Sequence, residues 1–357
     1  MAGLTAMTLR YLGYKFALNL LSASRLHTPL ARLKPARGII LAAHRVRPFE
    51  GTAFSPNRSL EITPDFLGDA LRLVRRRGYD LVSMDEAIRR LRQDTPNRFA
   101  VLTFDDGYHD HADYALPVMQ ALNVPGVFYI APGFVERSAA LWWEELEAIL
   151  AVNDHISLDH PAQEIRLETR TARQKQSAFD HIYRHIRSLP WVEARAATAE
   201  LARKYGISSA EQVENACLDW DGVRTLASDR LVTIGAHTVN HPVLAACPDE
   251  TITDELRHSR TILVNALQRP VRHLAYPHGD PTAAGAREFE TARDIGFDTA
   301  VTTRPGLVEN SHADNLTALP RVSLNGCFQS LGQLDVLISG APFMIRNALK
   351  PEPEAAR

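Results

Sequence analysis

The sequence predicts an α/β protein, an irregular (β/α)7–8 barrel that carries a helical insertion. Short β-prone runs recur along the chain, most of them are followed by a helical pattern, and 357 residues are enough for one large domain. Such alternation predicts parallel strands inside and helices outside. Seven or eight strand–helix units are enough to close a barrel.

Eight short apolar runs, rich in β-branched and aromatic residues, are predicted as strands. They are residues 38–44, 79–84, 99–104, 126–131, 230–237, 272–277, 298–303 and 319–324. Helical patterns lie between them, for example at 63–78 and 251–267. Both of these begin with a threonine, a residue type that caps helix N-termini.

One segment interrupts the alternation of strands and helices. Residues 141–218 are almost wholly helical and polar in pattern, and we expect a helical insertion between two barrel strands. The predicted organisation is therefore a basic amphipathic arm at 1–37, a barrel domain at 38–330 and a C-terminal helix with a disordered tail at 331–357.

Composition limits the class of protein. Apolar residues make up 45% of the chain and charged residues 23%, as in a globular protein with a sizeable core. The net charge of -2 gives no reason to expect nucleic acid as a partner. The three cysteines are far apart in the sequence, which argues against a disulfide framework or a thiolate zinc site and favours a reducing compartment.

The N-terminal segment is basic and amphipathic. Residues 1–49 hold eight Lys or Arg and no acidic residue, and the longest uncharged run within 9–26 is 16–24, too short to span a bilayer. Lys15 and Asn19 interrupt the hydrophobic region that a signal peptide needs. Apolar residues recur at roughly helical spacing, at Leu9, Leu12, Phe16 and Leu20. We expect a helix docked on the domain or lying on a membrane surface, in a protein that is cytoplasmic or membrane-peripheral rather than secreted.

Polar side chains follow several of the predicted strands, where a barrel of this kind places its active site. Asp105 and Asp106 follow 99–104, His44 ends 38–44, His237 ends 230–237, His278 follows 272–277, and Arg321 lies within 319–324. Two adjacent carboxylates repel one another unless a nearby group offsets their charge. A group near Asp105 and Asp106 is therefore expected to offset this charge, and a bound metal would do so.

The sequence HTVNH places His237 and His241 four residues apart. If this segment is helical, the two imidazoles share one face and can hold a single ion. Two histidines and one carboxylate form a common zinc set with an open position for water. One aspartate could then bind the metal while the other accepts a proton. The alternatives are a simple turn at Asp-Asp-Gly and two unrelated surface histidines.

These motifs resemble those of the polysaccharide deacetylase family, also called the NodB-homology or carbohydrate esterase family 4 domain. The family motif TFDDG is present unaltered at 103–107, and its H-[ST]-x-x-H motif is present at 237–241. Residues 114–134 are also similar to the family segment that follows the first motif. The resemblance covers roughly 38–325 without the insertion, and it implies a NodB-type barrel.

The resemblance also implies roles for the motif residues. Asp105 would be the general base, while Asp106, His237 and His241 would bind a divalent metal, usually Zn²⁺. A backbone N–H near Tyr108 would help to hold the oxyanion. The implied reaction removes acetyl groups from an N-acetylated or O-acetylated sugar, such as a chitooligosaccharide or an exopolysaccharide, so a carbohydrate is the expected partner.

The later motifs depart from the family pattern. Many members carry Arg-x-Pro-Tyr where this chain has LAYPHGD, with Ala275 in the place of the arginine, and this segment is similar to a branch with AYPxG. We expect Arg321 to supply the missing positive charge. Tyr276 and His278 of the same segment are expected to contact substrate.

The family's last motif normally brings a histidine as general acid, but the nearest counterpart, 335–342, contains none. His44, at the end of the first predicted strand, is expected to act as the acid or to polarise the substrate, the alternative being a structural histidine. His109 and His111 are expected to be exposed to solvent.

Two alternatives to a sugar deacetylase stay open. Fold and metal set do not fix the substrate, so an amidohydrolase acting on a non-sugar amide is the second hypothesis. The third is a catalytically weak carbohydrate-binding homologue, against which the intact Asp105 argues. Trp142 and Trp143 could stack on sugar rings or pack inside the insertion.

Overall fold

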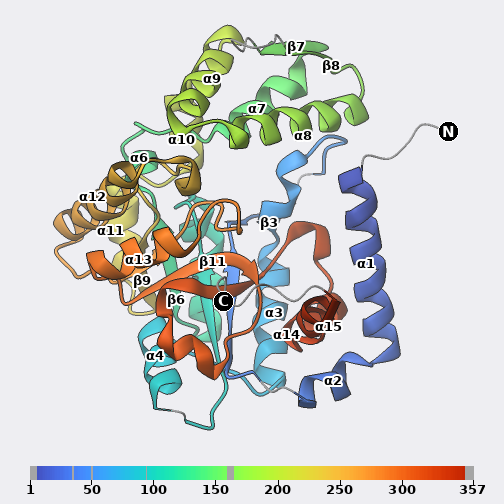
Figure 1. Cartoon of the computed structure of the whole chain (residues 1–357), viewed down its shortest axis with the longest axis vertical. Coiled ribbons are helices and arrows are strands. Elements are labelled where there is room, and N and C mark those ends of the chain that lie inside the picture. Colours follow the sequence, from blue (N-terminus) through green and yellow to red (C-terminus); the bar gives the residue numbers. More distant parts are fainter. Residues whose placement is uncertain (1–5, 34–35, 50, 94, 159–164, 350–357) are drawn as a thin grey trace.

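Seven parallel strands form a closed barrel at the centre of the molecule (Figure 1). A computed structural model describes residues 6–33, 36–49, 51–93, 95–158 and 165–349. The barrel strands are β1 (Gly38–Ala43), β5 (Phe99–Phe104), β6 (Gly126–Ile130), β9 (Val232–Ala236), β10 (His273–Ala275), β11 (Thr299–Pro305) and β12 (Leu319–Ser323). Each strand pairs with the next in chain order, and β12 pairs with β1 to close the ring.

All eight predicted strands are present, but one of them lies outside the ring. β4 (Asp80–Leu81) pairs only with the first two residues of β5, whereas β1 runs along the whole length of β5. The expected barrel of seven or eight strands is therefore confirmed with seven strands.

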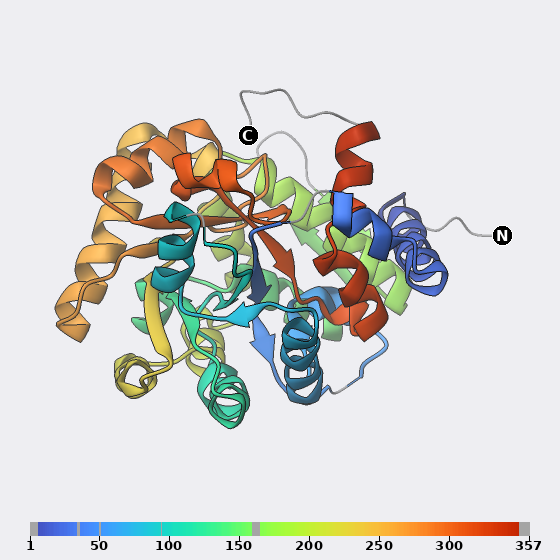
Figure 2. The same cartoon turned by 90° about the horizontal axis from the view of Figure 1, so that it is seen from below.

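Side chains alternate between the two faces of the barrel wall, as the two-residue period of a strand requires. On β1, Ile39 and Leu41 belong to the large cluster shared with the outer helices, whereas Ile40 belongs to a separate cluster with Val101 and Val127. Figure 2, seen from below, shows the strands at the centre of the molecule with helices around them.

The barrel helices follow the strands along the chain. They are α3 (Pro64–Arg76), α4 (Met84–Arg92), α5 (Leu116–Leu122), α11 (Trp220–Ser228), α12 (Asp249–Leu267) and α13 (Ala286–Ile295). Thr63 caps α3 as predicted, since its hydroxyl accepts a hydrogen bond from the Phe66 N–H. The prediction for α12 was wrong at its start, because the helix begins at Asp249 after Pro248 and Thr251 lies inside its first turn.

Residues 132–216, between β6 and α11, form a layer above the carboxyl ends of the strands (Figure 1). Its helices are α6 (Pro132–Val135), α7 (Trp142–Val152), α8 (Ala172–Ser188), α9 (Trp191–Lys204) and α10 (Ser209–Ala216). An antiparallel pair, β7 (His155–Leu158) and β8 (Ile165–Glu168), also lies here, although the sequence pattern had indicated an almost wholly helical segment. Trp143, Leu146 and Ile182 are buried in a core that belongs to this layer.

The two ends of the described chain lie together on one side of the barrel. α1 (Ala6–Ser24) packs against α14 (Leu331–Ile338), while α2 (His27–Leu33) and α15 (Ala341–Leu349) lie beside them (Figure 1). Leu18 of α1 is 1% exposed, and the Gln333 side chain donates a hydrogen bond to Asn19. Phe16 and Leu20, on the same helix, are 70% and 58% exposed.

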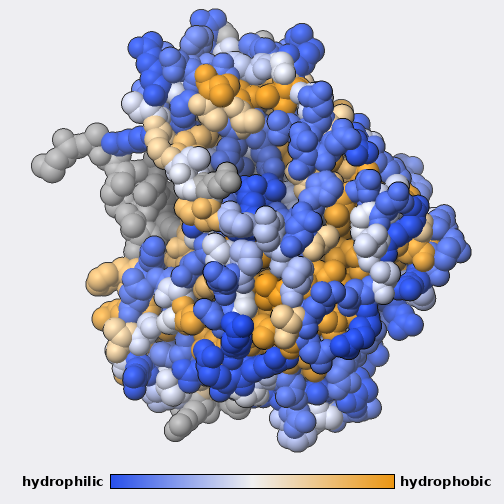
Figure 3. All heavy atoms as spheres, turned by 180° about the vertical axis from the view of Figure 1, so that it is seen from behind, coloured by the Kyte–Doolittle hydropathy of each residue, from blue (hydrophilic) through white to orange (hydrophobic). Residues whose placement is uncertain are grey.

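Among the described residues, no helix is both long and apolar enough to cross a membrane. Seen from behind, most of the molecular surface is hydrophilic, with hydrophobic side chains in separate patches (Figure 3). The predicted tail at 350–357 lies outside the described residues, and the division of the chain into arm, barrel domain and C-terminal segment stays a prediction.

Candidate active site

Asp105 lies at the carboxyl end of β5 and is bound by an arginine from the last barrel strand. Arg321 donates two hydrogen bonds to it, from Nη1 to Oδ1 at 2.8 Å and from Nη2 to Oδ2 at 2.7 Å. Both residues are almost completely buried, at 1% and 2% exposed. A bidentate contact of this kind fixes the orientation of a carboxylate and stabilises its ionised form.

Strand periodicity explains why these two residues meet. The cluster of Ile40, Val101 and Val127 lies inside the barrel and also contains Leu319. Asp105 lies four residues after Val101, and Arg321 lies two after Leu319, so the two-residue period of a strand places both on the interior face. Arg321 also donates to Thr103 Oγ1 at 3.2 Å and, through Nε, to the Thr302 carbonyl at 2.8 Å. The guanidinium of this β12 residue is therefore held by groups from two other strands, β5 and β11.

The Arg321 pair offsets the cost of burying Asp105. Burial alone would raise the pKa of Asp105, but the guanidinium of Arg321, with smaller effects from His237 and His44, holds that pKa well below its usual value. Asp105 is therefore a carboxylate at neutral pH, the protonation state that a general base needs.

His44 faces Asp105 from the end of β1. Its Nε2 lies 3.7 Å from Asp105 Oδ2, and its side chain is 21% exposed. The imidazole is thus within reach of both the base and solvent, as a proton donor to a leaving group requires.

Asp106, His237 and His241 form a compact, buried set of metal-ligating groups. The Nε2 atoms of His237 and His241 each lie 3.4 Å from Asp106 Oδ1. Bonds of about 2.0–2.1 Å to a tetrahedral ion place two ligand atoms about 3.3–3.4 Å apart. The spacing found here is therefore the spacing that such an ion imposes.

Two further observations test whether these residues fit a metal. Asp106 Oδ1 is buried and has no hydrogen-bond partner among the described residues, which is costly for a carboxylate oxygen unless a cation approaches it. His237 Nδ1 lies 2.7 Å from the Ala275 carbonyl, so Nδ1 carries the proton and Nε2 presents its lone pair to Asp106. The set fits a divalent cation.

The protonation of the two histidines also bears on metal binding. Burial lowers the pKa of His241 well below its usual value, and His237 and His278 add to this effect. His241 is therefore neutral, the form that ligates a metal. For His237, burial acts in the same direction, but Asp106 and Asp105 raise its pKa overall.

The histidine segment is a loop, so the two imidazoles do not share a helix face. His237 follows the end of β9, and both Thr238 and His241 have positive φ, at 59° and 55°. This left-handed geometry turns the chain back so that both rings reach Asp106. The two histidines thus lie close together through the geometry of a loop and not through that of a helix.

Glu255 of α12, which sequence reasoning missed, holds this loop in place. Its Oε2 accepts hydrogen bonds from the backbone N–H groups of Val239 at 2.8 Å and Asn240 at 2.9 Å. Its Oε1 accepts another from Asn240 Nδ2 at 2.6 Å. Glu255 lies on a helix fourteen residues after His241, and nothing in the sequence pattern distinguishes it from other helical acids.

The first motif and the insertion are linked by a second buried ion network. Arg45 donates to Asp110 Oδ2 at 3.0 Å and to Glu144 of α7 at 3.1 Å, and its guanidinium lies 4.5 Å from the Tyr108 ring centroid. The Tyr108 side chain is fully buried in the insertion core. Among the described residues no acceptor is bound to the Tyr108 backbone N–H, so that group is available to an oxyanion.

The structure separates the two expected substrate contacts of the LAYPHGD segment. The Tyr276 hydroxyl donates to the Thr317 carbonyl at 2.9 Å within the main core, so its ring packs away from the site. His278, with φ of 58°, instead lies beside the metal set, 4.9 Å between ring centroids from His241.

The expected exposure of His111 is wrong. Its side chain is fully buried between Phe104 and Phe128, and its Nε2 lies 2.6 Å from the His44 carbonyl. His111 therefore supports the segment that carries His44. His109 is partly exposed.

Comparison with known proteins decides the family. A sequence profile described as polysaccharide deacetylase matches residues 92–199 and 192–300, together more than half of the chain. The chain belongs to the polysaccharide deacetylase family. Membership indicates a hydrolase that removes acetyl groups from a polysaccharide, and deacetylases of this family are generally metal-dependent.

Solved structures show that this deacetylase shares its fold with proteins of low sequence identity. The Streptococcus pyogenes deacetylase PplD, in complex with acetate, is 18% identical with a TM-score of 0.56, over 86% of this chain and 99% of that one. IcaB from Ammonifex degensii is 18% identical with a TM-score of 0.55, over 86% and 98%. No functionally curated protein matches the sequence.

Proposed function

We propose that the protein is a Zn²⁺-dependent deacetylase that removes N-acetyl groups from a saccharide containing N-acetylglucosamine. The observation that carries this proposal is the arrangement of two neighbouring carboxylates in different roles. Asp105 is paired with Arg321, and Asp106 faces His237 and His241 at 3.4 Å. Chitooligosaccharides and exopolysaccharides are the candidate substrates.

Each residue of the site has a distinct task in this proposal. Asp106, His237 and His241 would hold the cation, which supplies Lewis-acid polarisation of the amide carbonyl and a lower pKa for water. Asp105 accepts a proton from the attacking water, and Arg321 keeps this carboxylate oriented and ionised. The Tyr108 N–H donates to the oxyanion as it develops. His44 then gives a proton to the leaving amine.

Acetate release is the direct test. Zinc-loaded wild-type protein and Asp105→Asn are compared on chitooligosaccharides, with Asp113→Asn, an exposed neighbour, as the matched control. Loss of a general base costs about 10²–10⁴-fold in rate. We expect that loss in Asp105→Asn and none in Asp113→Asn. Equal turnover by wild type and Asp105→Asn would remove Asp105 as the base.

The same assay separates the alternatives. Release of acetate from small N-acetylated amines, with none from saccharides, would indicate an amidohydrolase on a non-sugar amide. Saccharide binding without acetate release from any substrate would indicate a carbohydrate-binding homologue. The intact Asp105–Arg321 pair favours the enzyme, because a binding protein does not need a buried, oriented carboxylate at this position.

We also propose that α1 brings the protein to an anionic membrane surface from the cytoplasmic side. Phe16 and Leu20 are exposed on one face of this helix, and Lys15 and Arg25 lie close by in the sequence. Sedimentation with phosphatidylglycerol vesicles tests this. We expect binding that falls with salt and is lost in the double variant Phe16→Ser, Leu20→Ser. Equal binding by this variant would contradict the proposal.

A further inference from the structure

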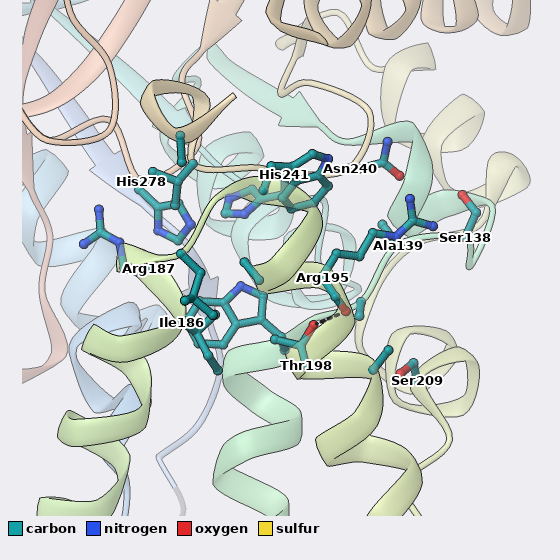
Figure 4. A pocket seen from close by; sticks show the side chains of 18 of the residues that line it. Ser138, Ala139, Ile186, Arg187, Arg195, Thr198, Ser209, Asn240, His241 and His278 are labelled. Atoms are coloured by element: carbon teal, nitrogen blue, oxygen red, sulfur yellow. Dashed lines mark hydrogen bonds between the residues drawn. The ribbon is translucent and has the colours of Figure 1, made fainter. Parts of the chain in front are cut away.

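A pocket lies between the insertion and the mouth of the barrel, directly beside the metal set. Its volume is about 220 Å³, and His241 and His278 form its barrel-side wall. Figure 4 shows these two histidines on one side of the pocket and residues of α9, such as Arg195 and Thr198, on the other. His241 belongs both to the metal set and to the pocket wall. A molecule whose acetamide lies at the metal set would therefore extend into this pocket.

Most of the pocket wall is apolar. The insertion supplies Trp142, Ile186, Leu189, Trp191 and Ala194, and the loop after His241 supplies Val243. Burying an aliphatic chain against such a surface is favourable, at about 0.8 kcal/mol for each methylene group. Aromatic walls alone would also suit sugar rings, but the aliphatic side chains of Ile186, Leu189 and Val243 offer nothing to sugar hydroxyls.

Four hydroxyl and amide side chains in the wall are hydrogen-bonded inside the protein. Ser138 donates to the Gly133 carbonyl at 3.4 Å, and Thr198 donates to the Arg195 carbonyl at 3.0 Å. Asn240 donates to Glu255, and Ser209 is hydrogen-bonded to Glu145. A sugar ring in this pocket would bury several hydroxyl groups against few matched partners, which is costly.

Three arginines also reach the pocket, and they differ in their partners. Arg137 pairs with Glu214 at 3.1 Å, and Arg187 pairs with Asp280 at 2.6 Å. The Arg195 guanidinium has no hydrogen-bond or ion-pair partner among the described residues, and it extends from α9 toward Ala139 and Asn240 (Figure 4). It is thus an uncompensated cation at the edge of an apolar pocket.

We propose that this pocket binds the aliphatic chain of an amphiphilic substrate, an N-acetylated saccharide whose acetamide lies at the metal set, and that Arg195 pairs with an anionic group linking chain and sugar. This inference rests on the proposed deacetylase function and narrows its substrate class. The apolar wall would bind the aliphatic chain, and the unpaired Arg195 guanidinium would bind the anionic group.

Matched synthetic substrates test the proposal. The probes are octyl and methyl N-acetylglucosaminides and the octyl and methyl phosphodiesters of N-acetylglucosamine 1-phosphate, all below the concentration at which they form micelles. Acetate release gives KM for each probe. We expect KM to fall about fourfold for each methylene that enters the pocket, so that octyl probes have KM at least tenfold below methyl probes.

Variants of α9 place the effect in the pocket. Ala194→Trp fills it, Ala199→Trp does so from a more exposed position, and Val192→Trp, on the solvent side of the same helix, is the matched control. We expect the two pocket variants to lose the lower KM for octyl over methyl probes, the octyl advantage, whereas Val192→Trp keeps both this advantage and the wild-type turnover of methyl probes. An octyl advantage that persists in both pocket variants, or that is absent in the wild type, would overturn the proposal.

Charge recognition is tested separately with Arg195→Gln and, as control, Arg76→Gln, an exposed arginine of α3. We expect Arg195→Gln to raise KM about tenfold for the octyl phosphodiester and to leave the neutral octyl glycoside unchanged. Equal effects on both probes would remove the anionic linker from the proposal.

A binding measurement separates failure of this inference from failure of the deacetylase function. Isothermal titration with octyl N-acetylglucosaminide reports occupancy of the pocket without any reaction. Suppose that no probe releases acetate, but that octyl N-acetylglucosaminide binds the wild type and Val192→Trp and does not bind Ala194→Trp or Ala199→Trp. This result would contradict the catalytic proposal and support the pocket assignment. No octyl binding by the wild type would sink the pocket assignment itself.

Discussion

The contact between Arg321 and Asp105 joins two residues that are 216 positions apart in the sequence. Both are buried, and the two-pronged hydrogen bond satisfies the carboxylate on both oxygens. The same geometry explains how a family member without the usual motif-three arginine can still orient its carboxylate, since Ala275 leaves that place to a side chain from another strand.

The first prediction concerns Arg321. Arg321→Lys keeps the charge but cannot present two parallel donors, so we expect turnover to fall about 10²-fold through misplacement of Asp105. Arg321→Ala leaves a buried unpaired carboxylate, and we expect it to lower the free energy of unfolding by about 3–5 kcal/mol. Kinetics and urea denaturation measure the two effects. Arg76→Lys is the control, and unchanged turnover in Arg321→Lys would show that Asp105 needs no oriented partner.

The second prediction concerns removal of the metal. Zn²⁺ at a hundredfold excess over its dissociation constant should stabilise the wild type by about 2.7 kcal/mol, because the ion binds the folded chain only. Asp106→Asn should bind zinc far more weakly and lose this stabilisation. Thermal unfolding with zinc and with chelator, and zinc content after dialysis, are the measurements. A zinc-dependent shift of equal size in Asp106→Asn would exclude Asp106 as a ligand.

At this scale the sequence predicted which polar residues follow the strands, because a two-residue period and a strand end are local properties. It could not distinguish Tyr276 from His278, which are two residues apart. The first turns into the core toward Thr317, and the second faces His241. Nor could it show that His111 is buried, since that depends on Phe104 and Phe128 from two different strands.

At the scale of elements, the histidine loop after β9 depends on a helix that contributes no ligand. Two positive-φ residues, Thr238 and His241, make the loop unfavourable on its own. Glu255 of α12 offsets this with three hydrogen bonds. A helical reading of HTVNH was natural from the spacing alone, because the spacing carries no information about α12.

The third prediction follows from this support. Glu255→Gln replaces one acceptor oxygen by a donor, so it cannot accept from both backbone N–H groups and from Asn240 at once. We expect zinc affinity to fall about 10–100-fold, as for other residues that orient metal ligands, with the fold intact. Competition with a zinc indicator measures this, and Glu250→Gln at the start of the same helix is the control. Unaltered affinity in Glu255→Gln would mean that the loop holds its own shape.

At the scale of the whole molecule, the architecture joins the ends of the chain at two places. β1 pairs with β12 in the barrel, and α1 packs on α14 outside it. The eight strands were predictable because each is a short apolar run with its own helix nearby. The position of β4 outside the ring was not predictable, because it depends on which strands pair with β5, and the apolar run 79–84 carries no information about that pairing. The β7–β8 pair inside the insertion was also missed, since each strand has only four residues.

The fourth prediction concerns the docking of α1. Leu18 is buried against the main core, so Leu18→Ala should lower the free energy of unfolding by about 2–5 kcal/mol. Leu20→Ala, exposed on the same helix, should change it by less than about 0.5 kcal/mol. Urea denaturation measures both. Equal, small changes would show that α1 contributes nothing to the folded state in solution.

The pairing of β1 with β12 also bears on the order in which the parts of the proposed site are synthesised. A ribosome delivers Asp105 early and Arg321 last among the barrel strands, so a nascent chain holds its prospective base without the partner that keeps it ionised and aligned. In the proposed mechanism, the base is therefore aligned only after the last barrel strand has been made. A chain without β12 would lack both the strand that closes the ring and the arginine that orients Asp105.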